Sequence, residues 1–220
     1  MALRREEIAR KLLHLFALVM PVCIYYFPKW NIPWYVASIA LAVVFVGSVI
    51  VETLRFRVPF IQKMFFTFFG SMLREEETHK VTGSTWVIGA ALICSIIFRN
   101  YSHISFMVLT LFILGDAIAA VVGLSIGRIK ILGKKSLEGS LACFLLCMIL
   151  FFAAFPFVPG LLDVWNGRVP FILAFVTSLT ITVFELIPLR VTRKYTINDN
   201  IAVPVIAGCV LLWLSKAITF

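Results

Sequence analysis

Charged residues are scarce in this chain of 220 residues, since only 14% are Asp, Glu, Lys or Arg, against roughly 25% in soluble domains. Three His and five Cys add few polar groups, and the five Cys lie in apolar runs without zinc-ligand spacing. We therefore expect the Cys to pack as small hydrophobic side chains. Hydrophobic residues make up 61% of the chain, and the mean hydropathy is +1.02. This composition excludes a soluble globular domain, a disordered tail and a disulfide scaffold.

The apolar residues form seven runs, most of them near the about 20 residues that a helix needs to cross a bilayer. Because a backbone in lipid must satisfy its own hydrogen bonds, we expect an all-α, polytopic membrane helix bundle, with one domain over residues 1–220. The first run has no small-residue cleavage site and should be retained. Val58–Leu73 carries Phe and Met at helical spacing, which favours an interfacial helix, with a re-entrant segment as the alternative. The seven runs are Leu12–Phe27, Trp34–Val51, Thr85–Phe98, Ile104–Val122, Leu141–Phe157, Pro170–Pro188 and Ile201–Thr219.

The distribution of charge predicts the orientation of the bundle. All but four of the 20 Lys and Arg residues precede the first run or follow the second, fourth and sixth runs. Because basic residues are retained in cytoplasmic loops, we expect a cytoplasmic N-terminus and an outer C-terminus. Asp163 is the one acidic residue in an outer loop. The net charge of +9 then needs no nucleic acid as a partner.

Three carboxylates lie in or at the ends of apolar runs. Asp116 lies within the fourth run, where an ionisable group is costly and is therefore functional by default, with a structural salt bridge as the alternative. Glu52 and Glu185 lie at run boundaries, where a site role and simple solvation are equally open. Beside Asp116, a stripe of small residues predicts close helix packing, within the bundle rather than in a homodimer. The stripe consists of Gly115, Ala119, Gly123 and Gly127.

The loop after the fourth run has the chemistry of a phosphate site. Lys134 and Lys135 follow Gly133 and precede Ser136 at a helix start, which offers point charges, a hydroxyl and backbone N–H groups. Glu138 could hold a magnesium ion against a bound phosphate. An orientation signal or a patch for lipid headgroups is the alternative interpretation. The spacing of this loop is not that of a P-loop.

The order of these residues closely resembles the signature of the CTP-dependent lipid kinases, which include dolichol kinase, phytol kinase and CTP-dependent diacylglycerol kinases. The central motif comprises Gly115-Asp116-Ala117, Gly123, Gly127-Arg128, Gly133-Lys134-Lys135-Ser136 and Glu138-Gly139-Ser140.

Four further elements extend the resemblance over nearly the whole chain. They are Arg10-Lys11 with His14, Glu52 with Arg55, Thr82-Gly83, and Asp199-Asn200 with Pro204 and Gly208. Asn198 departs from the family pattern, because many members carry a second Asp there.

The resemblance implies a kinase that transfers a phosphoryl group from CTP, with Mg²⁺, to the hydroxyl of a membrane lipid alcohol. Asp116 would act as the base or hold the metal, with Glu138 and Asp199 as further metal ligands. The nucleotide would contact Arg128, Gly133, Lys134, Lys135, Ser136 and Asn200. The lipid alcohol, a polyprenol, phytol or diacylglycerol, would contact His14, Glu52 and Thr82. We expect this site to face the cytoplasm of a prokaryotic plasma membrane.

Two other functions remain open. The central motif also resembles part of the phosphatidate cytidylyltransferases, which carry a His-containing element near the C-terminus. This chain has no His after His103, which favours the kinase. A transporter coupled through Asp116 is the third hypothesis, and the absence of a recognisable inverted repeat argues against it.

Overall fold

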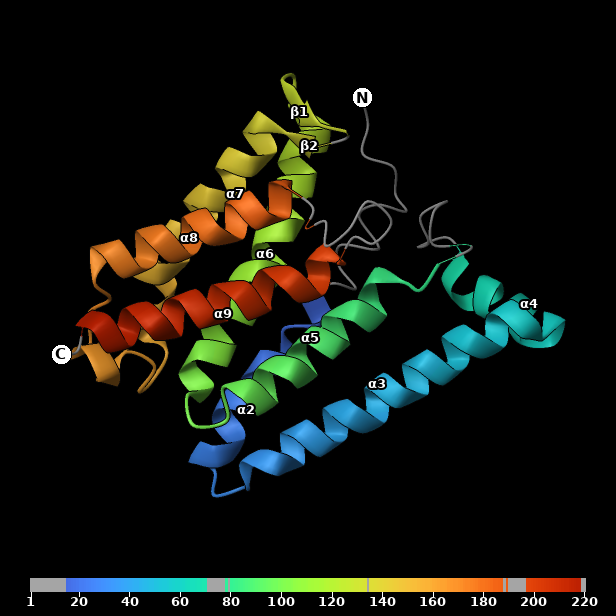
Figure 1. Ribbon diagram of the computed structural model, residues 1–220, viewed down its shortest axis with the longest axis horizontal. Coiled ribbons are helices and arrows are strands. Elements are labelled where there is room, and N and C mark those ends of the chain that lie inside the picture. Colours follow the sequence, from blue (N-terminus) through green and yellow to red (C-terminus); the bar gives the residue numbers. More distant parts are fainter. Residues whose placement is uncertain are drawn as a thin grey trace.

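The computed structural model describes residues 15–70, 78, 80–133, 135–187, 189 and 197–218. These residues form a bundle of helices with one short β-hairpin (Figure 1). The expected all-α architecture is confirmed. Within the described ranges, four helical segments are long and apolar enough to cross a membrane: Trp34–Arg57, Ser102–Ser125, Leu137–Phe157 and Asp199–Ile218. Gly83–Ile97 and Phe171–Leu186 are shorter apolar helices.

The helices follow the apolar runs of the sequence, and each run contains one. They are α2 (Val19–Lys29), α3 (Trp34–Arg57), α5 (Gly83–Ile97), α6 (Ser102–Ser125), α7 (Leu137–Ile149), α8 (Phe171–Leu186) and α9 (Asp199–Ile218). A π-helical turn, Leu150–Ala154, and a 3₁₀ turn, Phe155–Phe157, extend α7. Helix α4 (Pro59–Phe69) occupies the segment expected to lie in the interface.

The hairpin is a feature that the sequence pattern does not predict. Strands β1 (Lys130–Leu132) and β2 (Lys135–Ser136) pair antiparallel, with an irregular register between Lys130 and Leu132. Gly133 lies between the two strands with a φ of +56°, a conformation that glycine adopts without strain. The loop between α6 and α7 therefore has a defined backbone shape.

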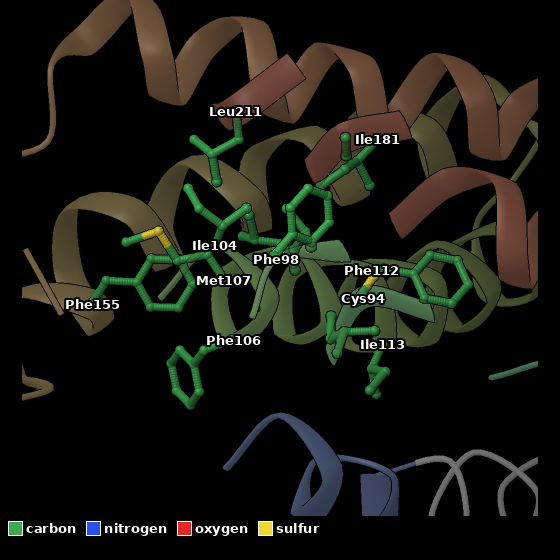
Figure 2. Close-up of a cluster of buried hydrophobic side chains, with 14 of the residues drawn as sticks. Cys94, Phe98, Ile104, Phe106, Met107, Phe112, Ile113, Phe155, Ile181 and Leu211 are labelled. Carbon is green, nitrogen blue, oxygen red and sulfur yellow. The ribbon is translucent and has the colours of Figure 1, made fainter. Parts of the chain in front are cut away.

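Helix α6 lies at the centre of the bundle (Figure 1). Every residue from Ile104 to Ile113 is buried, as expected for a helix that is apolar all round. Figure 2 shows side chains of other helices meeting this segment. The labelled members of the cluster are Cys94, Phe98, Ile104, Phe106, Met107, Phe112, Ile113, Phe155, Ile181 and Leu211.

The small-residue stripe of α6 packs against α7 inside the bundle, as the sequence favours. A Cβ atom placed on Gly115 would lie 2.9 Å from the Sγ atom of Cys143. One placed on Gly139 of α7 would lie 2.6 Å from the backbone oxygen of Ala119. One placed on Gly123 would lie 3.0 Å from the Oγ atom of Ser136. The two backbones therefore approach more closely than residues with larger side chains would allow.

The polar contacts gather at the two ends of the bundle. At one end, Lys29 donates to the backbone oxygen of Pro159, Arg99 lies over Trp34, and Lys216 lies over Tyr101. At the other end lie the hairpin, the C-terminal ends of α3 and α8, and the first residues of α5 and α9. The candidate site lies at this second end. So do the described Lys and Arg residues that follow the second and fourth apolar runs.

The α6–α7 contact predicts a loss of stability in Gly139→Ala. Its new methyl group would meet the Ala119 carbonyl, and we expect overpacking to lower the free energy of unfolding by about 1–3 kcal/mol. Thermal unfolding of the protein in detergent measures this change. Gly47→Ala is the matched control, because nothing lies within 4 Å of a Cβ atom there, and replacing an interior helical glycine with alanine is expected to stabilise by about 0.5–1 kcal/mol. Equal unfolding temperatures for the two variants would contradict the close contact.

Candidate functional site

The hairpin loop is held against the start of α7 by Glu138. The Oε1 atom of this residue accepts hydrogen bonds from the backbone N–H groups of Arg128 at 3.0 Å and Ile129 at 3.1 Å. The backbone N–H of Leu137 donates to the Ile129 oxygen at 2.9 Å. The side chains of Arg128 and Lys130 remain exposed on the loop. Glu138 therefore fixes the loop that carries the basic residues.

Ser136 is the N-cap of α7. Its Oγ atom accepts a hydrogen bond from the backbone N–H of Gly139 at 3.2 Å, which satisfies one of the free donors at the helix start. The side chain is buried beside Gly123 of α6 and Gly127, which follows the end of that helix. The hydroxyl expected to contact phosphate thus also joins the hairpin to the α6–α7 contact.

Lys135 reaches from β2 to the ends of two other helices. Its Nζ atom donates to the backbone oxygen of Glu185 and lies 3.1 Å from the Oε1 atom of the same residue. It lies 3.3 Å from the Oδ2 atom of Asp199, which opens α9. Burial alone would lower the pKa of Lys135, but the carboxylates of Glu185 and Asp199 outweigh it and raise the pKa above its usual value. The ammonium group is therefore held in its charged form.

Asp116 belongs to the same electrostatic group. It lies on α6, is partly buried, and interacts electrostatically with Glu185, as Asp199 does. Glu185 of α8 and Asp199 of α9 thus contact the ammonium of Lys135, and Asp116 of α6 interacts electrostatically with Glu185. Lys135 and Asp199, two of the predicted site residues, therefore lie in contact, and Glu185, whose role the sequence leaves open, interacts with both of them and with Asp116.

The expected metal ligands do not all meet. Glu138 is bonded to the backbone of the loop rather than grouped with Asp116 and Asp199. In the part of the chain that the structure describes, no group of three or more His, Cys, Asp or Glu side chains has the arrangement of a metal site. The Mg²⁺ ion therefore stays a prediction. The carboxylate that interacts with Asp116 and Asp199 is that of Glu185, which the sequence does not predict as a metal ligand.

A second buried network contains Glu52 and Thr82. Glu52 forms an ion pair with Arg55 at 2.6 Å between Oε2 and Nε, and both side chains are almost fully buried. The Oε1 atom of Glu52 accepts from the Thr82 hydroxyl at 2.6 Å and from the Thr82 N–H at 3.1 Å. The hypothesis that Glu52 is simply solvated at the end of its apolar run is therefore wrong, because this carboxylate is enclosed by protein.

Asn200 lies between the two networks. Its Nδ2 atom donates to the backbone oxygen of Gly83 at 3.2 Å, which ties the start of α9 to the start of α5. Its backbone N–H donates to the Oδ1 atom of Asn198 at 3.0 Å. Asn198, which departs from the resembled pattern, thus contributes a local hydrogen bond to the same helix start.

Two predicted site residues, His14 and Lys134, lie outside the described residues. Gly133 is in the hairpin turn, with open space around it. Glu185 contacts Lys135 but is not among the predicted site residues, although its position at the end of an apolar run gives a signal.

The chain matches no family model, no curated protein and no solved structure. The resemblance to lipid kinases therefore depends on the motif residues themselves.

The raised pKa of Lys135 predicts how stability depends on pH. A lysine whose pKa is raised in the folded state contributes stability in full below its ordinary value of 10.5, and this contribution is lost as pH rises through the folded pKa. We expect the difference in unfolding free energy between wild type and Lys135→Met to shrink above that pH, measured by unfolding in detergent. Lys130→Met, which removes an exposed lysine of the same hairpin, should show no such trend. A pH-independent effect of Lys135→Met would contradict the pairing.

The Glu52–Arg55 pair predicts a strong asymmetry between single and double variants. Arg55→Met leaves the carboxylate of Glu52 buried without its cation, which should cost about 3–5 kcal/mol of folding free energy. Glu52→Gln combined with Arg55→Met removes both charges and should recover most of this loss. Denaturant unfolding of the wild type, of Glu52→Gln and Arg55→Met singly, and of the double variant tests the expectation. Additive losses in the double variant would show that the pair is not buried as a unit.

Proposed function

We propose that this protein is a kinase that transfers the γ-phosphoryl group of CTP to the hydroxyl of a membrane lipid alcohol. The observation that carries the proposal is the position of Lys135. It lies on a glycine-containing loop and is held by Glu185 and Asp199 in the same group as Asp116. Phosphoryl transfer needs mainly positioning and charge neutralisation, and this set of side chains supplies both.

In this proposal the basic loop binds the nucleotide. Lys134, Lys135 and Arg128 neutralise the phosphates, while Ser136, Gly133 and Asn200 line the same region. The Lys135 ammonium has three donors and meets three acceptors, two on Glu185 and one on Asp199. A phosphate oxygen would therefore replace one of these acceptors when CTP binds.

The acidic group supplies the base and the metal ligands. Carboxylate oxygens are the ligands that Mg²⁺ prefers, so Asp116 and Asp199, with Glu185 beside them and Glu138 on the loop, have fitting chemistry. The ion would neutralise charge on the transferred phosphate. As the lipid oxygen bonds to the γ-phosphorus and the bond to the β-phosphate oxygen breaks, the hydroxyl proton passes to Asp116 and CDP leaves. Asp116 as a metal ligand instead of the base is the alternative within the same mechanism.

The membrane arrangement of the proposal follows the charge distribution. Seven helices would cross a prokaryotic plasma membrane, with the N-terminus and the site on the cytoplasmic side. The exposed Phe60, Met64 and Phe68, spaced at four residues on α4, support an interfacial position for this helix. The lipid alcohol would then enter from the bilayer, with its tail among the apolar helices and His14 near its hydroxyl.

A direct assay tests the proposal. The protein in detergent is given γ-labelled CTP, Mg²⁺ and a polyprenol, phytol or diacylglycerol, and we expect the label to pass to one of these lipids. Asp116→Asn should lower the turnover by about 10²-fold or more, the lower end of the effect of a positioned base. Lys135→Met should lower it by about 10²-fold or more, as for a lost donor at a developing charge.

The control and the contrary outcomes are defined by the same assay. Lys130→Met, on the exposed side of the hairpin, should retain wild-type turnover. Release of pyrophosphate with a CDP-lipid product would establish the cytidylyltransferase alternative, which shares the central motif. Absence of transfer to any of the three lipid classes would overturn the proposed kinase for those substrates.

A further inference from the structure

We propose that the buried Glu52–Arg55 pair positions the candidate site through the first residues of α5 and α9, instead of contacting the lipid substrate. The role of the site rests on the proposed function, whereas the mechanical connection between the two networks does not. The proposal assigns Glu52, Arg55 and Thr82 as positioning residues.

The carboxylate of Glu52 is enclosed by protein groups on both oxygens. Its Oε1 atom accepts from the hydroxyl and N–H of Thr82 and lies 3.4 Å from the Thr85 hydroxyl, while Oε2 pairs with Arg55. A carboxylate offers about four acceptor positions. Only 3% of Glu52 is exposed, so a lipid hydroxyl could reach it only by breaking this arrangement.

Arg55 holds the opposite side of the same backbone segment. Its Nη2 atom donates a hydrogen bond to the backbone oxygen of Lys80 at 2.6 Å. The guanidinium lies over the rings of Phe56 and Phe65, at 4.6 and 4.5 Å, so helix α4 also packs against it. Together, Glu52 and Arg55 fix the carbonyl of Lys80 and the N–H of Thr82, and thereby the start of α5.

The start of α5 in turn holds the start of α9. The oxygen of Gly83 directly follows the fixed Thr82 and accepts the hydrogen bond from Asn200. Asn200 is adjacent to Asp199, whose Oδ2 atom contacts Lys135. A continuous set of polar contacts thus leads from the α3–α5 junction to the ammonium that the proposed function assigns to the nucleotide.

The desolvation energy lost when an ion pair is buried can exceed the attraction between its two charges. A contribution to folding stability is therefore a weak explanation for the presence of the Glu52–Arg55 pair. Fixing the two helix starts gives it a positioning role. A positioning role predicts a change at α9 when only the α3–α5 junction is altered.

Hydrogen–deuterium exchange of the full-length protein in detergent measures this coupling without any substrate. The variants are Thr82→Val, which removes one hydroxyl donor at nearly constant shape, and Glu52→Gln with Arg55→Met, which removes both charges. Losing the equivalent of one hydrogen bond should speed exchange in peptides covering Ile197–Val205 and Lys135–Ser140 by up to about tenfold. Because the two variants alter the same junction in different ways, the test stays decisive if one of them folds poorly.

Ser38→Ala is the matched control. Ser38 also forms a buried hydrogen bond between α3 and α5, to Ser95 at 3.0 Å. This bond lies near the opposite ends of the two helices from Glu52 and Thr82. This variant should change exchange in α3 and α5 and leave both site peptides at the wild-type rate. Wild-type exchange of the site peptides in the Thr82→Val protein and in the double variant would overturn the positioning role.

The kinase assay separates this proposal from the function. With active protein, positioning predicts that Thr82→Val lowers kcat while the KM for the lipid alcohol stays within about twofold, because no binding contact is lost. A direct lipid contact predicts a raised lipid KM with unchanged exchange at α9, which would refute the positioning role. If no lipid is phosphorylated but exchange at α9 changes, the proposed function fails and the connection between the networks stands.

Discussion

The close packing of α6 against α7 determines where most of the candidate site lies. Small residues on both helices let the two backbones meet, and Ser136 caps α7 at the edge of that contact. The hairpin is anchored beside the cap by Glu138, so Lys135 is carried to a fixed position. Asp116 directly follows Gly115, which packs against Cys143 in that contact. Larger side chains along this line would separate the base candidate from the basic loop.

Two groups of opposite charges lie at one end of the bundle in the described part of the chain. Lys135 with Glu185 and Asp199, and Arg55 with Glu52, place opposite charges together where burial would penalise either sign alone. The Lys135 group joins segments that are far apart in the sequence, since Lys135 precedes α7, Glu185 lies near the end of α8 and Asp199 starts α9. The charges therefore act as connections between helix ends as well as candidates for chemistry.

Much of the fold follows from elementary patterns. Apolar runs predict the helices, because lipid and a buried core both require intrahelical hydrogen bonds. Prolines before α3 and α8, and at the first position of α4, mark helix starts. The hairpin between Lys130 and Ser136 escapes prediction because strands of three and two residues give too short a pattern. The role of Glu138 as a loop anchor escapes for a related reason, since its acceptors face backbone N–H groups that carry no sequence signal.

The sequence by itself determined the apolar helices, the segregation of basic residues, the small-residue stripe and the motif around Asp116 and Lys135, because each depends on residue type and spacing along one segment. Only the tertiary structure decided which carboxylates meet the ammonium. Glu185 and Glu52 have similar positions at run ends, yet one contacts Lys135 and the other pairs with Arg55 beneath Thr82. That difference arises from which helices pack together, and contacts between segments 50 or more residues apart, such as Lys135 with Glu185, leave no periodic trace in the chain.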